Sequence, residues 1–182
     1  LGSHWRLPHS GINVKRYPAC YATHRSIDAM IDLARKHDLK PDAVKEIRVR
    51  TGRTQKLMLR NSNPKTGLEA KFSMQFALAS ALVARRVGLS ELTDAFVRRP
   101  DVGANVAKVN CTVTDETMAE FPMMAPDDRV SVVLTNGKVI EHGPVVYAKG
   151  SWQRPLTREE LEEKFQDCAT RRLDRTHAEN LF

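Results

Sequence analysis

Apolar positions repeat at helical spacing in two long stretches of the chain, residues 23–36 and 69–86. Residues three and four positions apart share one face of a helix, so each repeat predicts an amphipathic helix with that face in the core. Thr23 is expected to cap the first helix at its N-terminus. The second carries an apolar stripe that starts at Phe72, and Gly88 is expected to end it. These two helices are the clearest structural prediction of the pattern.

Shorter patterns supply the remaining elements. Alternating apolar and polar residues are typical of strands, and Asn136-Gly137 favours a hairpin turn. Thr157 and Glu160 form the sequence signature of a capping box at a helix start. The expected helices are 90–97 (capped by Ser90), 101–108 and 157–172, and the expected strands are 44–51, 109–114, 130–134 and 138–147. We therefore expect an α+β fold, an antiparallel sheet with helices packed on one face.

The composition is that of a globular domain. With 182 residues and a hydrophobic fraction of 41%, the chain can form one cored domain, or one domain with an appendage. It has no apolar run of membrane-spanning length and no signal-peptide pattern. Cys20, Cys111 and Cys168 lie far apart, which argues against a disulfide framework and an iron–sulfur cluster. We expect a cytoplasmic protein with no membrane partner.

The charge of the chain and one loop point to an anionic ligand. The net charge is +7, but the basic residues are dispersed, which is more typical of a solvated surface than of a nucleic-acid stripe. Residues 15–25, Lys-Arg-Tyr-Pro-Ala-Cys-Tyr-Ala-Thr-His-Arg, concentrate cationic and imidazole groups just before the first helix. Free N–H groups and the helix dipole at such an N-terminus attract anions. The pattern predicts a carboxylate or phosphate site without naming a reaction.

Three collinear blocks resemble the MmgE/PrpD family, which includes 2-methylcitrate dehydratase, cis-aconitate decarboxylase and iminodisuccinate epimerase. The first block is Gly11-Ile-Asn-Val-Lys-Arg-Tyr-Pro-Ala-Cys followed by Thr23-His-Arg and Ile27-Asp-Ala. The second is Glu69-Ala-Lys-Phe-Ser-Met-Gln-Phe-Ala, and the third is Gly150 with Pro155-Leu-Thr and Lys164-Phe. Together the blocks span nearly the whole chain.

The resemblance implies a place for this chain within a larger enzyme. It covers the C-terminal part of such enzymes, less than half of a full member. Family members have a helical domain and an α+β lid domain, with the active site in the cleft between them. The resemblance therefore implies a linker from a missing N-terminal helical domain at 1–15, a lid domain at 16–152 and a helical segment returning to that domain at 153–182. It also implies a homodimer, and a chain that is catalytically inert by itself.

The implied chemistry is proton abstraction next to a carboxylate of a small di- or tricarboxylate. Such a reaction needs cations that stabilise the developing negative charge and a base within reach of the carbon acid. Loss of water, loss of carbon dioxide or reprotonation can follow, so dehydratase, decarboxylase and epimerase all remain open. The resemblance implies a lyase that uses no cofactor, with 2-methylcitrate dehydratase as the best match. Cys20 favours the dehydratase over the decarboxylase, because cis-aconitate decarboxylases carry a catalytic histidine at that position.

Seven residues of this sequence are candidates for the site. Cys20 and His24 are the candidate catalytic residues, although Cys20 could equally be a small buried apolar residue and His24 could only orient the helix. Two ligands are too few for a metal site. The candidate substrate-binding residues are Lys15, the match to the family's active-site lysine, with Tyr17, Arg25, Met58 and Lys71. Met58 falls near a position where a relative has a tyrosine, and Lys71 is expected on the exposed side of the second helix.

Two functions of another class remain as alternatives. One is a basic α+β module that binds nucleic acid. RNA-binding sheets stack bases on aromatic side chains, and Tyr147 is the only aromatic residue on the expected strands. A nucleic-acid partner is therefore disfavoured. The other is a non-catalytic interaction domain whose first loop binds phosphate.

Overall fold

The structure is a computed structural model that describes residues 7, 11–119 and 121–182. Contacts within the chain divide it into a central unit and a terminal unit. The central unit is Tyr17–Val146, and the terminal unit combines Leu1–Arg16 with Tyr147–Phe182. Each unit is described by itself below.

The predicted domain limits are only partly addressed by this division. The linker expected at 1–15 lies largely outside the described residues. The limits of the lid at 16–152 and of the returning segment at 153–182 refer to a longer protein and stay predictions. The chain passes from one unit to the other between Arg16 and Tyr17 and again between Val146 and Tyr147.

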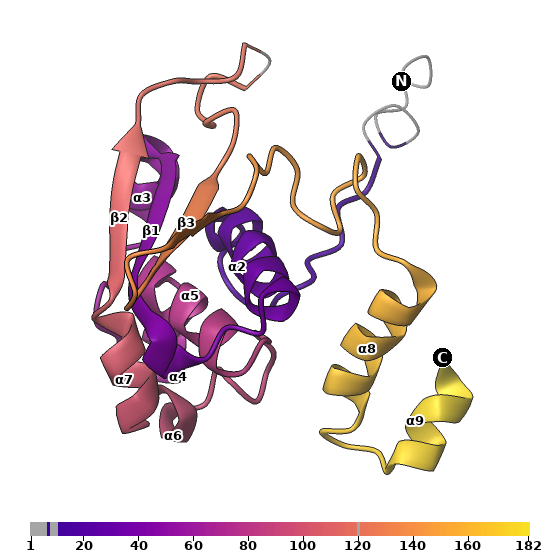
Figure 1. Cartoon of the computed structure of the whole chain (residues 1–182). Helices are drawn as coiled ribbons and strands as arrows, with labels where there is room; N and C mark the ends of the chain where they lie inside the picture. The colour runs from indigo at the N-terminus through magenta and orange to yellow at the C-terminus, as the bar shows by residue number, and fades with distance from the viewer. Residues whose placement is uncertain (1–6, 8–10, 120) are drawn as a thin grey trace. The chain divides into compact units, whose positions relative to one another are not determined.

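A four-stranded sheet with the strand order β2-β1-β3-β4 forms one layer of the central unit (Figure 1). The β1–β2 pair is parallel, whereas β1–β3 and β3–β4 are antiparallel. The α+β class is therefore confirmed, and the sheet is mixed rather than purely antiparallel. The strands are β1 (Val44–Gly52), β2 (Val109–Thr114), β3 (Arg129–Leu134) and β4 (Val139–Glu141).

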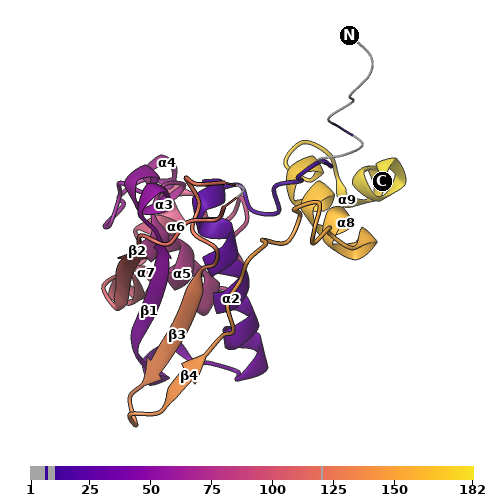
Figure 2. The same cartoon turned by 90° about the horizontal axis from the view of Figure 1, so that it is seen from above.

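Alternation along the strands separates a core face from an open face. Ile47 and Val49 of β1 are buried, while Arg48 between them is exposed. Successive side chains of a strand point to opposite faces, so the arginines of β1 share the face away from the core. Helices α2 (His24–Lys36) and α5 (Met74–Val83) cover the core face, as Figure 2 shows. The expected packing of helices on one face is confirmed.

The second long helix is broken, contrary to the prediction. It consists of α4 (Gly67–Ala70) and α5, separated by a turn. Ser73 has an extended backbone, and its side chain accepts a hydrogen bond from the N–H of Phe76, so it caps a new helix there. Phe72 consequently leaves the apolar stripe and is 43% exposed. The apolar period continued across the break because α5 is buried on nearly all sides.

The predicted end of this helix is also wrong. The helix ends at Val83, and Arg85, not Gly88, takes the left-handed backbone conformation with a φ of 52°. The Arg85 guanidinium pairs with Asp38, which holds this unusual residue in place. Arg85 therefore takes the left-handed conformation that glycine usually takes after a helix, and its ion-pair partner comes from a distant part of the sequence.

The smaller elements match the prediction in most places. The hairpin turn at Asn136-Gly137 is confirmed, with a φ of 85° at Gly137, but β4 is much shorter than the expected strand 138–147. Thr93 rather than Ser90 caps the short helix that begins at Asp94, and its side chain accepts a hydrogen bond from the Phe96 N–H. The sequence did not predict α3 or α9. The other helices are α3 (Arg53–Met58), α6 (Asp94–Val97), α7 (Pro100–Val106), α8 (Arg158–Ala169) and α9 (Arg175–Leu181), with 3-10 turns η1 (Tyr21–Thr23) and η2 (Pro41–Ala43).

The terminal unit is organised around one carboxylate at the start of α8. The capping box is confirmed: Thr157 accepts from the N–H of Glu160, and the Glu160 carboxylate accepts from the N–H of Thr157. The same carboxylate pairs with Arg16 and with Lys149, each at 2.5 Å. The chain on both sides of the central unit is thereby tied to α8. In the described part of the chain, no helix has the length and apolarity that crossing a membrane requires.

Candidate functional site

The loop before α2 is held by buried aromatic and polar contacts. The Tyr17 hydroxyl donates a 2.6 Å hydrogen bond to Asp28 Oδ1 on the second turn of α2. The His24 ring lies between two aromatic rings, with centroids 5.1 Å from Tyr17 and 4.8 Å from Tyr21. His24 has no exposed surface, and its Nε2 lies 3.4 Å from the Ala19 carbonyl oxygen. Tyr17 and His24 therefore belong to the packed wall behind the loop.

Asp28 and Tyr21 were not singled out from the sequence. Asp28 lies one helical turn after His24, on the same side of α2. An acidic residue on the apolar face of a predicted helix could have indicated this contact, because a buried carboxylate needs a hydrogen-bond partner. Burial raises the pKa of the Tyr21 hydroxyl, and the nearby Asp28 charge raises it further against the opposing charge of Arg25.

Arg25 is part of a buried ion pair. Its Nη2 lies 3.3 Å from Asp128 Oδ1, and its Nη1 donates to the carbonyl oxygens of Ala125 and Val146. Asp128 is fully buried and also accepts hydrogen bonds from the hydroxyls of Ser26 at 2.7 Å and Thr51 at 2.9 Å. Arg25 thus joins α2 to the sheet. The geometry gives it a structural role, and its predicted contact with substrate stays untested.

Burial dominates the electrostatics of this cluster. It raises the pKa of the Asp128 carboxyl, while Arg25 and the two hydroxyl donors act in the opposite direction. The sequence did not reveal Asp128, because its hydroxyl partners Thr51 and Ser26 lie 77 and 102 residues away and Arg25 directly precedes Ser26. Only the position of the start of β3 beside α2 brings them together.

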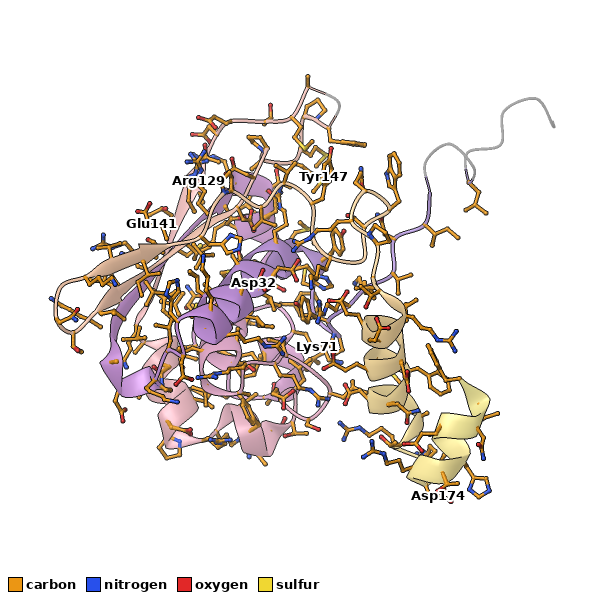
Figure 3. The ribbon with its side chains drawn as sticks, turned by 45° about the vertical axis from the view of Figure 1, so that its right-hand side comes forward. Asp32, Lys71, Arg129, Glu141, Tyr147 and Asp174 are labelled. Carbon is orange, nitrogen blue, oxygen red and sulfur yellow. The ribbon has the colours of Figure 1, made fainter. Side chains whose placement is uncertain are left out.

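Cys20 and Lys71 are brought together from two separate sequence blocks. The backbone N–H of Cys20 donates a 2.8 Å hydrogen bond to the carbonyl oxygen of Lys71. Cys20 is half-buried against the core, and Lys71 follows the last residue of α4 and is half-buried (Figure 3). Lys71 therefore lies on a turn, not on the exposed side of a continuous helix as predicted. Ser73, the N-cap of α5, is fully buried.

Met58 lies at the C-terminal end of α3 and is 47% exposed. Helix α3 contacts η1, which directly follows Cys20. Thr23 lies in η1; its side chain makes no cap hydrogen bond, and its hydroxyl donates instead to the Cys20 carbonyl oxygen at 2.8 Å. The central unit thus brings the segments that carry Cys20, Met58 and Lys71 next to one another around the start of α2.

Lys15 belongs to the terminal unit, where it is exposed. The described residues contain no group of three or more His, Cys, Asp or Glu side chains placed to hold a metal ion. Near the start of α2, Cys20 and Lys71 are half-buried, whereas Tyr17, His24 and Asp28 are buried. Such an arrangement can hold an anion and shape one wall of a site.

The sequence comparison decides the family. A family model described as the MmgE/PrpD C-terminal domain matches residues 17–181. The chain belongs to the MmgE/PrpD family. This membership confirms the resemblance carried by the three sequence blocks.

Two curated relatives in the MmgE/PrpD family illustrate the match. The chain is 27% identical over 185 residues to cis-aconitate decarboxylase of Homo sapiens, covering 98% of this chain and 37% of that protein. It is 27% identical over 191 residues to cis-aconitate decarboxylase of Mus musculus, covering 100% of this chain and 38% of that protein. The chain therefore spans less than two fifths of the length of these relatives. Family members such as these are enzymes.

Proposed function

We propose that this chain forms one wall of the active site of a cofactor-independent lyase that acts on a small di- or tricarboxylate. The observation that carries the proposal is the family match over residues 17–181. In this proposal Lys15 and Lys71 bind substrate carboxylates, because lysine ammonium groups are strong donors to carboxylate oxygens. The backbone N–H of Cys20 is hydrogen-bonded to the Lys71 carbonyl oxygen, which places the two residues side by side. The full-length protein supplies the carbon-acid base from its helical domain.

The reaction that we propose is dehydration of the 2-methylcitrate type. Cys20 supports this choice. A cysteine thiol is mostly protonated near neutral pH, whereas imidazole gains and loses a proton there. A decarboxylase that relies on histidine at this position would lose that acid–base group. Decarboxylation is the second candidate, supported by the names of the two relatives, and epimerisation is the third.

A nucleic-acid module has less support than the lyase. None of the residues in β1, β2, β3 and β4 is aromatic. Tyr147, the aromatic residue expected on a strand, lies beyond the end of β4 (Figure 3). Base stacking on this sheet would therefore lack its platform.

Proton NMR in deuterium oxide tests the proposed reaction. The full-length protein is incubated with 2-methylcitrate, citrate, cis-aconitate, iminodisuccinate and tartrate, with the 182-residue chain as the control. We expect water loss or solvent exchange at one of these acids with the full-length protein, and no turnover with the chain by itself. Release of carbon dioxide from cis-aconitate would show that the reaction is a decarboxylation and not the proposed dehydration. Fast turnover by the 182-residue chain would overturn the proposal that it contributes only one wall.

A further inference from the structure

Two arginines face each other across the open side of the sheet. Arg50 of β1 and Arg129 of β3 are direct partners in the antiparallel register. Like charges directly opposite each other destabilise a strand pair. A protein that keeps this arrangement needs negative charge close to both guanidinium groups.

Asp127 supplies part of that negative charge. Its Oδ1 accepts hydrogen bonds from Arg50 at 3.0 Å and from Arg129 at 3.2 Å. Burial opposes the charged form, but the hydrogen bonds from Arg129 and Arg50 outweigh it and lower the pKa of the Asp127 carboxyl. One carboxylate therefore serves two guanidinium groups, which leaves one positive charge in excess at this point of the sheet.

Arg50 also has an unused donor. Its Nε is buried and has no hydrogen-bond partner among the residues that the structure describes. A buried donor without a partner loses its hydration and gains nothing in return. A change of the Arg50 rotamer that turns this donor toward an oxygen ligand in the depression would remove that penalty.

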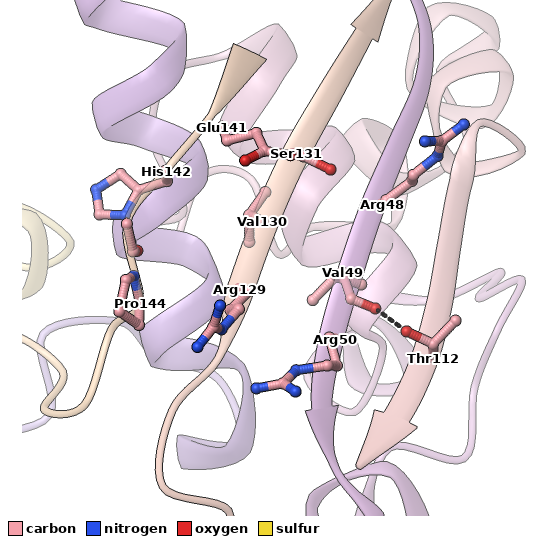
Figure 4. Close-up of a pocket in the computed structure, with 11 residues that line it drawn as sticks. Arg48, Val49, Arg50, Thr112, Arg129, Val130, Ser131, Glu141, His142 and Pro144 are labelled. Atoms are coloured by element: carbon pink, nitrogen blue, oxygen red, sulfur yellow. Dashed lines mark hydrogen bonds between the residues drawn. The ribbon is translucent and has the colours of Figure 1, made fainter. Parts of the chain in front are cut away.

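The two arginines line one end of a depression of about 510 Å³ on the open face (Figure 4). Thr112 and Ser131 contribute hydroxyl groups to the lining, and His142 an imidazole. Arg48 also lines it, but its charge is balanced by Glu46 at 2.8 Å. Glu141 stands opposite Ser131 in the register, and its carboxylate repels an anionic ligand from that part of the depression. The excess of positive charge is confined to the end with Arg50 and Arg129.

We propose that this depression binds a small oxyanion, held by Arg50 and Arg129. The planar guanidinium fork matches the oxygen geometry of phosphoryl and carboxylate groups alike. The ligand chemistry is therefore a phosphoryl group or a pair of carboxylates. The site uses residues that the proposed lyase chemistry does not use, and it stands or falls independently of that function.

Calorimetric titration of the 182-residue chain at low ionic strength tests the site, with pyrophosphate and citrate as separate probes. Arg50→Ala and Arg129→Ala remove one ligand each. Arg98→Ala, which removes an exposed arginine of the same unit that pairs with Asp94, is the matched control for the change in net charge. Arg50→Lys keeps the charge but lacks the Nε donor and the fork, and it serves if the alanine variant fails to fold. Asp127→Asn frees both guanidinium groups from their shared carboxylate.

We expect each alanine variant to weaken binding of the preferred probe at least tenfold, Arg50→Lys at least threefold, and Arg98→Ala less than twofold. Asp127→Asn should tighten binding severalfold. In nitrogen-15 NMR spectra of the unaltered chain, the Arg50 Nε–H signal should shift as the probe is added, and the shift should saturate at the same probe concentration as in calorimetry. Preference for pyrophosphate identifies a phosphoryl ligand, and preference for citrate a polycarboxylate.

Three results would overturn the proposal. One is an equal loss of affinity in Arg50→Ala and Arg98→Ala, which would mean attraction by net charge alone. The second is saturable binding that Lys15→Ala abolishes and Arg50→Ala leaves intact, which would place the anion at the proposed lyase site. The third is failure of both pyrophosphate and citrate to shift the Arg50 Nε–H signal, which would mean that neither anion binds in this depression.

Discussion

Cys20 and Lys71, which lie 51 residues apart in the sequence, are joined by a 2.8 Å hydrogen bond between the Cys20 N–H and the Lys71 carbonyl oxygen. The bond links the loop before α2 to the turn after α4. Backbone atoms therefore hold these two segments together.

We predict that Lys15→Ala weakens the binding of citrate-like acids roughly tenfold to a hundredfold. The physical reason is the loss of one charge-assisted hydrogen bond, worth about 1.5–3 kcal/mol. Calorimetric titration of the full-length protein measures the change. Lys36→Ala, at the exposed end of α2, is the control for net charge and should stay within twofold. Equal effects of the two substitutions would remove Lys15 from the site.

We predict that Arg25→Ala lowers the free energy of unfolding by about 3–5 kcal/mol, because it leaves the fully buried Asp128 without its cation. Urea denaturation of the 182-residue chain measures this. Arg98→Ala breaks an exposed pair with Asp94 and should cost about 0–1 kcal/mol. A cost for Arg25→Ala as small as that of the control would show that the buried pair is not a stabilising contact.

We predict that the Glu160 carboxyl titrates below its ordinary value of 4.5. Burial raises its pKa, but hydrogen bonds from Lys149 and the Thr157 N–H, with the charge of Arg16, lower it by more. The folded pKa is thus below the unfolded one. The stabilisation is present above about pH 4.5 and is lost as the pH falls through the folded pKa.

Carbon-13 NMR of the glutamate carboxyl groups measures that titration directly. Glu160→Gln should destabilise the folded chain at pH 7 and have little effect at a pH below the folded pKa. Glu162→Gln in the same helix is the matched control. A Glu160 midpoint at or above 4.5 would contradict the role assigned to Lys149 and Arg16.

We predict that Gly150→Ala is more destabilising than Gly137→Ala. Both glycines have positive φ, 88° and 85°, so each substitution costs about 1–2 kcal/mol of backbone strain. A Cβ at Gly150 would also come within 2.0 Å of the Val14 carbonyl oxygen, whereas nothing lies within 4 Å of one at Gly137. Thermal unfolding of the two variants compares them, and equal losses would show that the chain around Val14 moves aside freely.

Local patterns were sufficient where an element's residues determine it without distant partners. Helix α2, the Asn136-Gly137 hairpin and the capping box at Thr157 all follow from neighbouring residues. The break at Ser73 was missed because an apolar period continues when both helices are buried. The parallel β1–β2 pair was missed because strand direction depends on the intervening chain path.

The candidate site residues stay predictions. The sequence blocks contain both Cys20 and Lys71, and the structure joins their backbones. The sequence predicted that Arg25 binds substrate, and the structure pairs it with the buried Asp128. Such a partner becomes visible only after packing, because Asp128 lies far from Arg25 in the sequence.

By itself the sequence determined the family, the α+β class and the helices and turns whose stabilising contacts are local. The tertiary structure alone decided the pairing of Arg25 with Asp128, the shared carboxylate of Arg50 and Arg129, and the unused donor of Arg50. The physical reason is distance along the chain. Capping, turn geometry and apolar periodicity act over a few residues, whereas charges brought together from separate strands and helices acquire partners only after the chain has packed.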